Sequence, residues 1–374
     1  MDDKKMILRL ALAHAKGLGP VRARELLARL GSVEAVFAET VGSLANLGLE
    51  KTVASHLLSS ENMDFSEKEW HFLQTNGVQV LFIGDKDYPF RLRECADAPV
   101  LFMYKGNCSL SAPKMLAVVG TRHATEQGRI FTHRLVADLA ERHPDLVVVS
   151  GLAYGIDVAA HKAALEAGIA TVGVMATGLD RLYPVQHKKV ASQMKNQGGL
   201  LTEHFRGDAL VPGCFVSRNR IIAGLCDGVV VVESSADGGA LTTADIANSY
   251  SREVFAVPGR PDDVYAVGCN ELIKQNKAAL VTSAADVEFQ LGWDNVKEQN
   301  AESSTFPELN LTDLSEQELR VVSEIRHRGG DMESSELSVF LGVSSSQLAS
   351  IMFAMEMRGL VHRVPGNRYA VGKK

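Results

Sequence analysis

The chain has 374 residues, which is too long for one ordinary domain, so we expect two or three. Hydrophobic residues make up 46% and charged residues 22%, the balance of a globular protein. The formal net charge of −6 excludes a surface coated with basic residues but permits local basic patches. The five cysteines form no CxxC pair and have no histidine at zinc spacing, so we expect free thiols and no metal site.

The first 17 residues are acidic and then amphipathic, without the long apolar core of a signal peptide. No apolar run in the sequence approaches the length that crosses a membrane. We therefore expect a cytoplasmic protein with no membrane partner.

Residues 1–68 are expected to form an N-terminal helical domain. Leucine and alanine recur at helical spacing on both sides of Gly17-Leu18-Gly19-Pro20, which predicts a helix-hairpin-helix or SAM-like unit. Such a turn can present backbone N–H groups to a DNA phosphate, and Lys16 and Arg22 lie near it. The pattern is equally typical of a helical hairpin that serves only for packing.

Residues 69–290 are expected to form the main domain. Two short strands come first, and from residue 113 buried apolar strands alternate with helices. This alternation predicts the α/β class, with an extended Rossmann-like parallel sheet covered by helices on both faces. The expected strands are Val78–Ile83, Val100–Tyr104, Met115–Val119, Leu146–Val149, Ala170–Met175, Leu200–Glu203, Val229–Glu233, Val254–Val257 and Leu280–Thr282.

Residues 291–312 are polar and aperiodic, which is typical of a linker. Residues 313–374 become helical again, with predicted helices from residue 314, over 333–341 and over 345–358. A short hairpin is expected to pair residues 359–363 with 368–371. Three helices and a hairpin predict a C-terminal winged helix.

The predicted strand Met115–Val119 is followed by Gly120, Thr121 and Arg122. A glycine directly after a strand permits close backbone approach, and an arginine at the next helix start suits bidentate contact with a phosphate. The GxGxxG pattern is absent, which disfavours a dinucleotide site of the usual type. An ordinary turn with a surface arginine is the alternative.

The predicted strand Leu146–Val149 leads into Ser150 and Gly151, which predict another anion-facing turn. Ser150 with Asp157 and His161 suggests a catalytic triad. However, the GxSxG elbow is missing, and Asp157 and His161 share one helix face, so a structural Asp–His pair is favoured. Further on, Lys188 is expected either on a basic rim or at a solvated helix start.

A cluster of Phe215, Arg218, Asn219 and Arg220 precedes an apolar helix. An aromatic ring that stacks on a base, with guanidinium groups along the backbone, suits single-stranded nucleic acid. A core position for Phe215 and a capping role for Asn219 are the alternatives. Beyond the next strand, Gly238, Gly239 and Thr242 predict a tight turn that faces a phosphate at a helix start.

Five motifs in order, VVGTRHAT, SGLAYGIDVAAHKAAL, GLDRLYP, FVSRNRIIAGLCDGVVVVES and GGALTTADIA, resemble the DNA-processing protein A family, also called DprA or Smf. The resemblance implies single-stranded DNA binding, loading of the RecA recombinase during natural transformation, and a homodimer. It implies that Gly120, Thr121 and Arg122 bind phosphate and that Ser150, Gly151, Gly155 and Asp157 shape the pocket. It also implies that Phe215, Arg218, Asn219 and Arg220 hold nucleotides. The sequence departs from the family pattern at Thr121, His187 and Val216, and in the segment HFRGDALVPGC.

The leading hypothesis is therefore a DNA-binding protein that is not an enzyme and needs no cofactor. No nucleophile and base accompany the predicted site. Two alternatives are a Rossmann-like nucleotide phosphoribohydrolase, which the glycine turn at 238–243 faintly suggests, and a transcription regulator, which the winged helix alone suggests.

Overall fold

The computed structural model describes residues 3–293, 315–327, 331–358, 360–364 and 368–371. The chain divides into two compact units, residues 1–294 and residues 295–374. Most of the predicted linker at 291–312 lies outside the described residues. Among the helices that the structure describes, none is long and apolar enough to cross a membrane.

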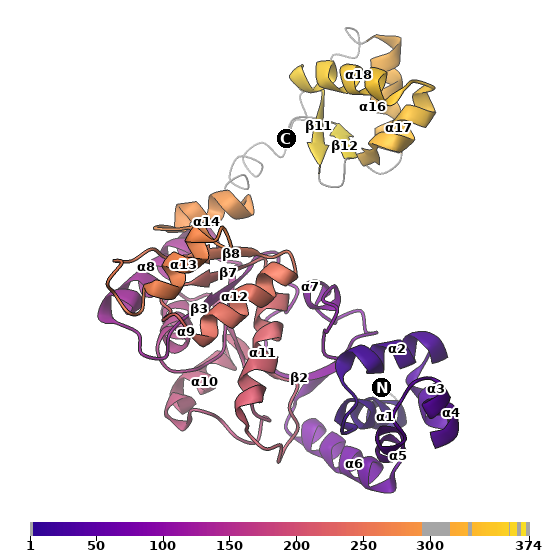
Figure 1. The fold of residues 1–374 in the computed structure, drawn as a ribbon, viewed down its shortest axis with the longest axis vertical. Coiled ribbons are helices and arrows are strands. Elements are labelled where there is room, and N and C mark those ends of the chain that lie inside the picture. The colour runs from indigo at the N-terminus through magenta and orange to yellow at the C-terminus, as the bar shows by residue number, and fades with distance from the viewer. Residues whose placement is uncertain (1–2, 294–314, 328–330, 359, 365–367, 372–374) are drawn as a thin grey trace. The chain divides into compact units, whose positions relative to one another are not determined.

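Six helices begin the first unit and lie beside strands β1 (Gln79–Phe82) and β2 (Leu101–Gly106) (Figure 1). Their apolar faces share one hydrophobic core with those two strands, so the helical segment is continuous with the sheet. The predicted boundary at residue 68 falls inside the sixth helix. The helices are α1 (Asp3–His14), α2 (Pro20–Leu30), α3 (Val33–Ala38), α4 (Val41–Asn46), α5 (Lys51–Leu57) and α6 (Ser60–Thr75).

The predicted hairpin turn joins α1 to α2. Gly17 has a φ of +83°, a conformation that favours glycine, and a Cβ there would lie 2.8 Å from the side chain of Val53. Pro20 is the first residue of α2, a position whose N–H makes no hydrogen bond within the helix, so proline fits there at no cost. Gly19 precedes it and provides no side-chain cap.

A nine-stranded sheet forms the centre of the first unit, in the order β1-β2-β6-β5-β4-β3-β7-β8-β9. Neighbours from β6 to β9 are parallel, whereas β2 is antiparallel to β1 and to β6, so the sheet is mostly parallel. Every predicted strand is present, with its ends within two residues of the prediction. The other strands are β3 (Met115–Val119), β4 (Val147–Ser150), β5 (Ala170–Val174), β6 (Gly198–Thr202), β7 (Gly228–Val231), β8 (Glu253–Ala256) and β9 (Ala279–Leu280).

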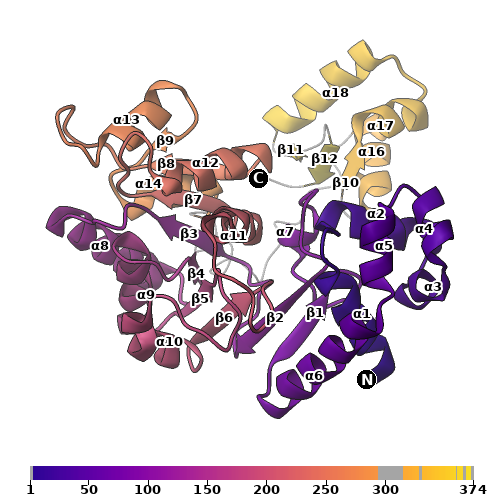
Figure 2. The ribbon, with the colours of Figure 1, turned by 60° about the horizontal axis from the view of Figure 1, so that its bottom comes forward.

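Helices cover both faces of this sheet, because its strands are apolar on both sides. In β3, Met115, Ala117 and Val119 face one core, and Leu116 and Val118 face the other. Figure 2 shows α8 (Glu126–Arg142), α9 (Ile156–Glu166) and α10 (Lys188–Met194) along one side of the sheet. On the other side lie α7 (Phe90–Arg93), α11 (Pro212–Leu225), α12 (Gly239–Ser249) and α13 (Val267–Lys274).

A buried polar chain attaches the last helix of the unit, α14 (Ala284–Leu291), to the sheet. The ammonium of Lys114 lies 2.8 Å from Nδ1 of His143, and Nε2 of His143 lies 2.7 Å from the carboxylate of Glu288. Trp293 packs edge-on against His143, so the core continues past the predicted end at residue 290.

The second unit contains α16 (Glu316–His327), α17 (Ser334–Leu341) and α18 (Ser345–Met357). Its antiparallel sheet has the order β10-β12-β11, formed by β10 (Asp331–Glu333), β12 (Arg368–Val371) and β11 (Val361–Val364). Met352 and Met355 are buried in its core, whereas Phe353 and Met357 are exposed. The three helices and the hairpin agree with the sequence, and the winged-helix assignment itself stays a prediction.

Candidate nucleic-acid interface

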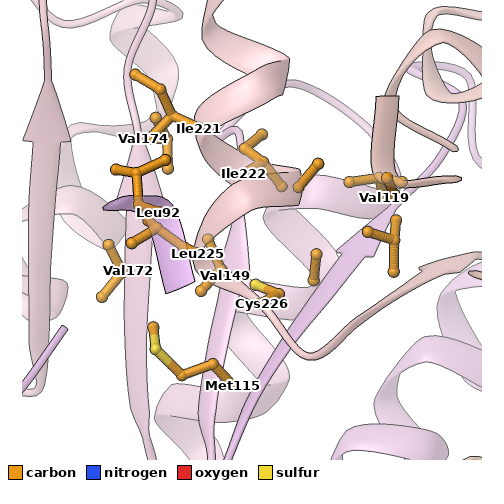
Figure 3. Packing of buried hydrophobic residues seen from close by; sticks show 14 of the residues in the cluster. Leu92, Met115, Val119, Val149, Val172, Val174, Ile221, Ile222, Leu225 and Cys226 are labelled. Carbon is orange, nitrogen blue, oxygen red and sulfur yellow. The ribbon is translucent and has the colours of Figure 1, made fainter. Parts of the chain in front are cut away.

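The predicted site residues meet at one edge of the main sheet. Strands β3, β4, β5 and β7 are parallel, so their carboxyl ends and the turns that follow lie at the same edge. Helix α11 reaches this edge. Figure 3 shows Ile221, Ile222 and Leu225 packed among sheet residues, which anchors the second half of α11 in the core. Its first half carries residues 215–220 at the carboxyl edge.

Arg122, Tyr183 and Phe215 form an aromatic–arginine cluster at this edge. The guanidinium carbon of Arg122 lies 4.9 Å from the ring centroid of Phe215. The Phe215 ring in turn meets the Tyr183 ring at 5.7 Å, in an edge-on arrangement. Arg122 is exposed, Tyr183 is 44% exposed and Phe215 is half-buried. The cluster therefore presents a cation and aromatic surface together to solvent.

A second aromatic residue lies on the neighbouring turn. Tyr154 is 39% exposed, meets the ring of His187 edge-on, and donates a hydrogen bond to the side-chain carbonyl of Gln186 at 2.7 Å. Gly155 follows Tyr154 and approaches the backbone of Arg122 so closely that a Cβ would lie 2.8 Å from its carbonyl carbon. Lys188 is exposed and is the first residue of α10.

Gly120 and Thr121 form a tight backbone turn at the end of β3. The N–H of Thr121 donates to the carbonyl of Glu233 at 2.7 Å, which ties the turn to the end of β7. A Cβ on Gly120 would lie 2.6 Å from the side chain of Ile156, so glycine is required for this packing. The turn thus fixes the backbone from which Arg122 projects.

Arg218 is not on the surface, which corrects its predicted contact with nucleotides. It is 4% exposed, and its guanidinium donates to the carbonyls of Gly151, at 2.6 Å, and of Val174. Burial lowers the pKa of Arg218 to about 10, and the nearby carboxylate of Asp157 opposes this shift. The side chain therefore remains charged at neutral pH and joins α11 to the ends of β4 and β5.

Gly151 lies against the guanidinium of Arg218. This corrects the prediction that Gly151 forms a turn facing an anion. A Cβ at Gly151 would lie 2.5 Å from the guanidinium carbon of Arg218, so the arginine already fills the space above it. Ser150 is also buried, and its hydroxyl donates to the carbonyl of Val118 at 2.6 Å. Neither residue offers a group to a ligand here.

Arg220 is likewise engaged within the protein. Its guanidinium pairs with the carboxylate of Glu203 and donates to the carbonyl of Asp97. The side chain is 11% exposed, so the predicted contact with a DNA phosphate does not match its position. An ion pair of this kind holds α11 against the segment before β2 and the turn after β6.

The suspected triad is not assembled, and the predicted Asp157–His161 pair is not formed. Asp157 accepts hydrogen bonds from the backbone N–H of Gly151, at 3.2 Å, and of Ala153, at 3.4 Å. Nδ1 of His161 lies 2.7 Å from the hydroxyl of Thr171, and burial lowers the pKa of His161 to about 3. Asp157 also interacts with the side chain of Ser150, whereas His161, which a triad needs as its base, pairs with Thr171.

The turn before α12 lies beside the middle of α11. The amide of Asn219 accepts from Nε of Arg218 at 3.2 Å and reaches the carbonyl of Gly239 at 3.5 Å. Gly238 precedes the helix, and a Cβ there would lie 2.1 Å from the hydroxyl oxygen of Ser234. Gly239 is exposed and Thr242 is half-buried, so the start of α12 opens toward solvent.

Two exposed aromatic residues, Tyr154 and Tyr183, were not among the predicted site residues. A sequence signal for both existed, since each stands in the connection that follows a strand ending at the carboxyl edge. Aromatic residues are sparse in this chain, at 6%, which makes two of them in such connections informative.

Comparison with known proteins identifies relatives along most of the chain. A DNA processing protein DprA from Streptococcus pneumoniae is 44% identical over 205 residues, which is 55% of this chain and 71% of that protein. Protein Smf from Escherichia coli is 30% identical over 382 residues, which is 98% of this chain and 95% of that protein.

Solved structures agree with these relatives. The X-ray structure of DprA from Streptococcus pneumoniae matches with a TM-score of 0.65 and 35% identity, covering 75% of this chain and 96% of that one. A DNA processing protein A structure from Helicobacter pylori, described for its single-stranded DNA binding mode, matches with a TM-score of 0.52 and 27% identity, covering 58% and 96%.

The family described as DNA recombination-mediator protein A matches residues 79–292, more than half of the chain. Its match spans the whole sheet and every turn at the carboxyl edge. The chain belongs to this family, that of the DprA and Smf proteins, as its sequence motifs predict.

Proposed function

We propose that this protein binds single-stranded DNA at the carboxyl edge of its main sheet. The aromatic–arginine cluster of Arg122, Tyr183 and Phe215 carries this proposal, because a cation and two rings gather there at the surface. Rings stack on any base, and a guanidinium contacts the sugar-phosphate backbone, so the combination suits a strand without a fixed sequence. The single-stranded DNA binding mode described for the Helicobacter pylori relative supports it.

The charges around the cluster favour the same ligand. Arg181, Lys188 and Lys189 are exposed on the segment that also carries Tyr183. The chain as a whole is acidic, with a net charge of −6, so an attraction for DNA must come from such a local group of cations. Gly239 and Asn219, at the open start of α12, extend the surface that we propose for the strand.

An anisotropy titration with a fluorescent oligothymidine tests the proposal. Arg122→Ala should weaken binding by about 1.5–3 kcal/mol, since it removes a charge-assisted interaction with a phosphate. The slope of log K against log salt should also become shallower, by roughly 0.7 for each phosphate that the variant no longer neutralises. Arg129→Ala is the matched control, because Arg129 is an exposed arginine on the following helix that pairs with Glu126. Equal affinities of both variants and the wild type would refute the assignment.

We propose that the protein binds DNA without catalysing a reaction and without a cofactor. The position of His161 supports this, since its Nδ1 pairs with the Thr171 hydroxyl, and a nucleophile and its base must contact each other. Incubation with nucleoside monophosphates, followed by chromatography for released base, tests the phosphoribohydrolase alternative. Release of base above the level of a heat-denatured sample would contradict our proposal.

We further propose that the protein is a cytoplasmic homodimer that delivers single-stranded DNA to the RecA recombinase during natural transformation, as the family resemblance implies. Sedimentation velocity measures the oligomeric state. The recombinase step is tested by adding the protein to DNA coated with single-strand-binding protein and following ATP hydrolysis by RecA. Faster onset of hydrolysis is expected, and no change in onset would contradict this part of the proposal.

A further inference from the structure

The start of helix α8 is the place where a Rossmann-like sheet offers its best phosphate site. This helix follows the first strand of the parallel part of the sheet, β3, next to β7, where the strand order reverses. It is 17 residues long, and the backbone N–H groups and partial positive charge at its first turn attract anions. A free nucleotide would be expected to place its phosphate there.

In this protein the position is occupied by a carboxylate of the chain itself. Glu233, two residues after β7, accepts a hydrogen bond from the backbone N–H of Thr125 at 2.9 Å and a second from the Thr125 hydroxyl. The Thr125 oxygen accepts from the N–H of Gly128 at 3.0 Å, as the N-cap of α8. The N–H groups of Thr125 and Gly128 and the Thr125 hydroxyl are therefore already paired within the chain.

The side chain of Glu233 also occupies the space at the start of α8. A Cβ added to Gly128 would lie 2.4 Å from the carboxylate carbon of Glu233, so the acid rests directly on the first turn of α8. The main-chain carbonyl of Glu233 accepts the N–H of Thr121 at 2.7 Å, which engages the turn after β3 too. One residue thus supplies the negative charge, the acceptors and the volume that a phosphate would bring.

We propose that Glu233 is a specificity-determining residue that closes the start of α8 to inorganic phosphate and to free nucleotides. This inference rests on the proposed function, because it names the ligand class of the same edge of the sheet: a DNA strand and not a mononucleotide. A mononucleotide has a single phosphate and a single base and loses its strongest anchor. A strand binds through several bases and phosphates at once, on the exposed cluster around Arg122, so it does not need the start of α8.

The test compares the wild type with Glu233→Ala and with Glu126→Ala. Glu126 is an exposed acid in the first turn of the same helix, so its removal changes the net charge equally but leaves the Thr125 donors paired. Inorganic phosphate and AMP are titrated into each protein and followed by calorimetry and by the amide resonances of Thr125 and Gly128. Glu233→Ala should bind both anions at least about tenfold more tightly than the other two, since hydrogen bonds to a charged group exceed 1.4 kcal/mol.

The titration of the wild type tests the inference even if Glu233→Ala does not fold. No shift of the Thr125 and Gly128 resonances is expected at millimolar phosphate or AMP, and a saturable shift there would overturn the inference. A folded Glu233→Ala that gains no affinity over Glu126→Ala would overturn it as well. Oligothymidine binding is measured on the same samples. Its absence in the wild type would refute the proposed function, whatever the phosphate titrations show.

Discussion

Three arginines near the carboxyl edge of the sheet differ in what surrounds their guanidinium groups. Arg122 lies over the Phe215 ring and faces solvent, so it can exchange water for a phosphate at little cost. Arg220 is paired with Glu203, and Arg218 is enclosed by backbone carbonyls. A charge that is buried and fully hydrogen-bonded is held in place by its partners, because moving it to a ligand would leave those carbonyls unpaired.

Arg218→Ala should therefore act on stability rather than on DNA binding. The substitution removes the cation beside the buried carboxylate of Asp157 and frees two carbonyl acceptors, which should cost about 3–5 kcal/mol of the free energy of unfolding. Urea denaturation measures this, with Arg129→Ala as an exposed control whose change should stay within about 0.5 kcal/mol. A stable Arg218→Ala protein with weakened DNA binding would contradict our assignment and restore the direct role.

Phe215→Ala should weaken DNA binding with little change in its salt dependence. A ring that stacks on a base contributes about 1–3 kcal/mol, and no counterion is released when the stack forms. Phe90→Ala is a matched control, because Phe90 reaches solvent and, like Phe215, lies against an arginine, with 4.6 Å from the Arg91 guanidinium to its ring. An equal loss of affinity in both variants would show that the ring of Phe215 has no specific part in binding.

At the scale of elements, helix α11 shows how far sequence reasoning reaches. The apolar second half of this helix and the strand after it were predictable, because apolar helical runs and β-branched runs are local signals. The sequence also predicted that Phe215, Arg218, Asn219 and Arg220 contact nucleic acid, but it placed them before the helix, whereas they lie inside it. It did not predict that Arg218 points inward, because the acceptors that hold it belong to Gly151 and Val174, far away in the chain.

The turns at the carboxyl edge follow the same rule. Their glycines were predictable as places of close backbone approach, but which group approaches is a property of the fold. At Gly151 the approaching group is a guanidinium, whereas at Gly120 it is the apolar side chain of Ile156. A glycine that faces a ligand and a glycine that faces an internal side chain have identical sequence signals, so only the assembled sheet separates them.

His161, on helix α9, should make the free energy of unfolding fall as the pH becomes acidic. Burial, with further contributions from His187 and Arg218, lowers the pKa of His161 to about 3 in the folded protein, against an ordinary value of 6.5. Above pH 6.5 the residue is neutral in both states and contributes no pH dependence. Between pH 6.5 and about 3 only the unfolded chain is protonated, so stability falls with acid by at most about 1.4 kcal/mol per pH unit.

Urea titrations at several pH values measure this effect. His161→Asn keeps a donor for the Thr171 hydroxyl but cannot be protonated, so its stability should depend less steeply on pH over the same range. His71→Asn, on the exposed face of α6, is the control and should retain the wild-type slope. Parallel slopes for the wild type and His161→Asn would show that His161 is not responsible.

At the scale of the whole molecule, the chain consists of two compact units with different surfaces. The proposed DNA-binding residues all belong to residues 1–294. On the second unit, the third helix α18 exposes Phe353 and Met357, at 65% and 74%, where a winged helix that reads DNA would carry polar and basic residues. Arg358, just after the helix, pairs with Glu318. Exposed methionine and aromatic side chains of this kind suit a protein partner better than a DNA groove.

A chain that ends at residue 294 should therefore keep most of the affinity for single-stranded DNA. The first unit retains its complete core, including Trp293 on His143, so the truncation should fold and bind oligothymidine within about tenfold of the full chain, or roughly 1.4 kcal/mol. Residues 295–374 alone should bind weakly and should select no operator sequence from a random duplex pool. If the truncation loses more than tenfold while its circular dichroism and unfolding transition stay normal, the second unit contacts DNA directly. Enrichment of one duplex sequence by residues 295–374 would favour the transcription-regulator alternative for that unit.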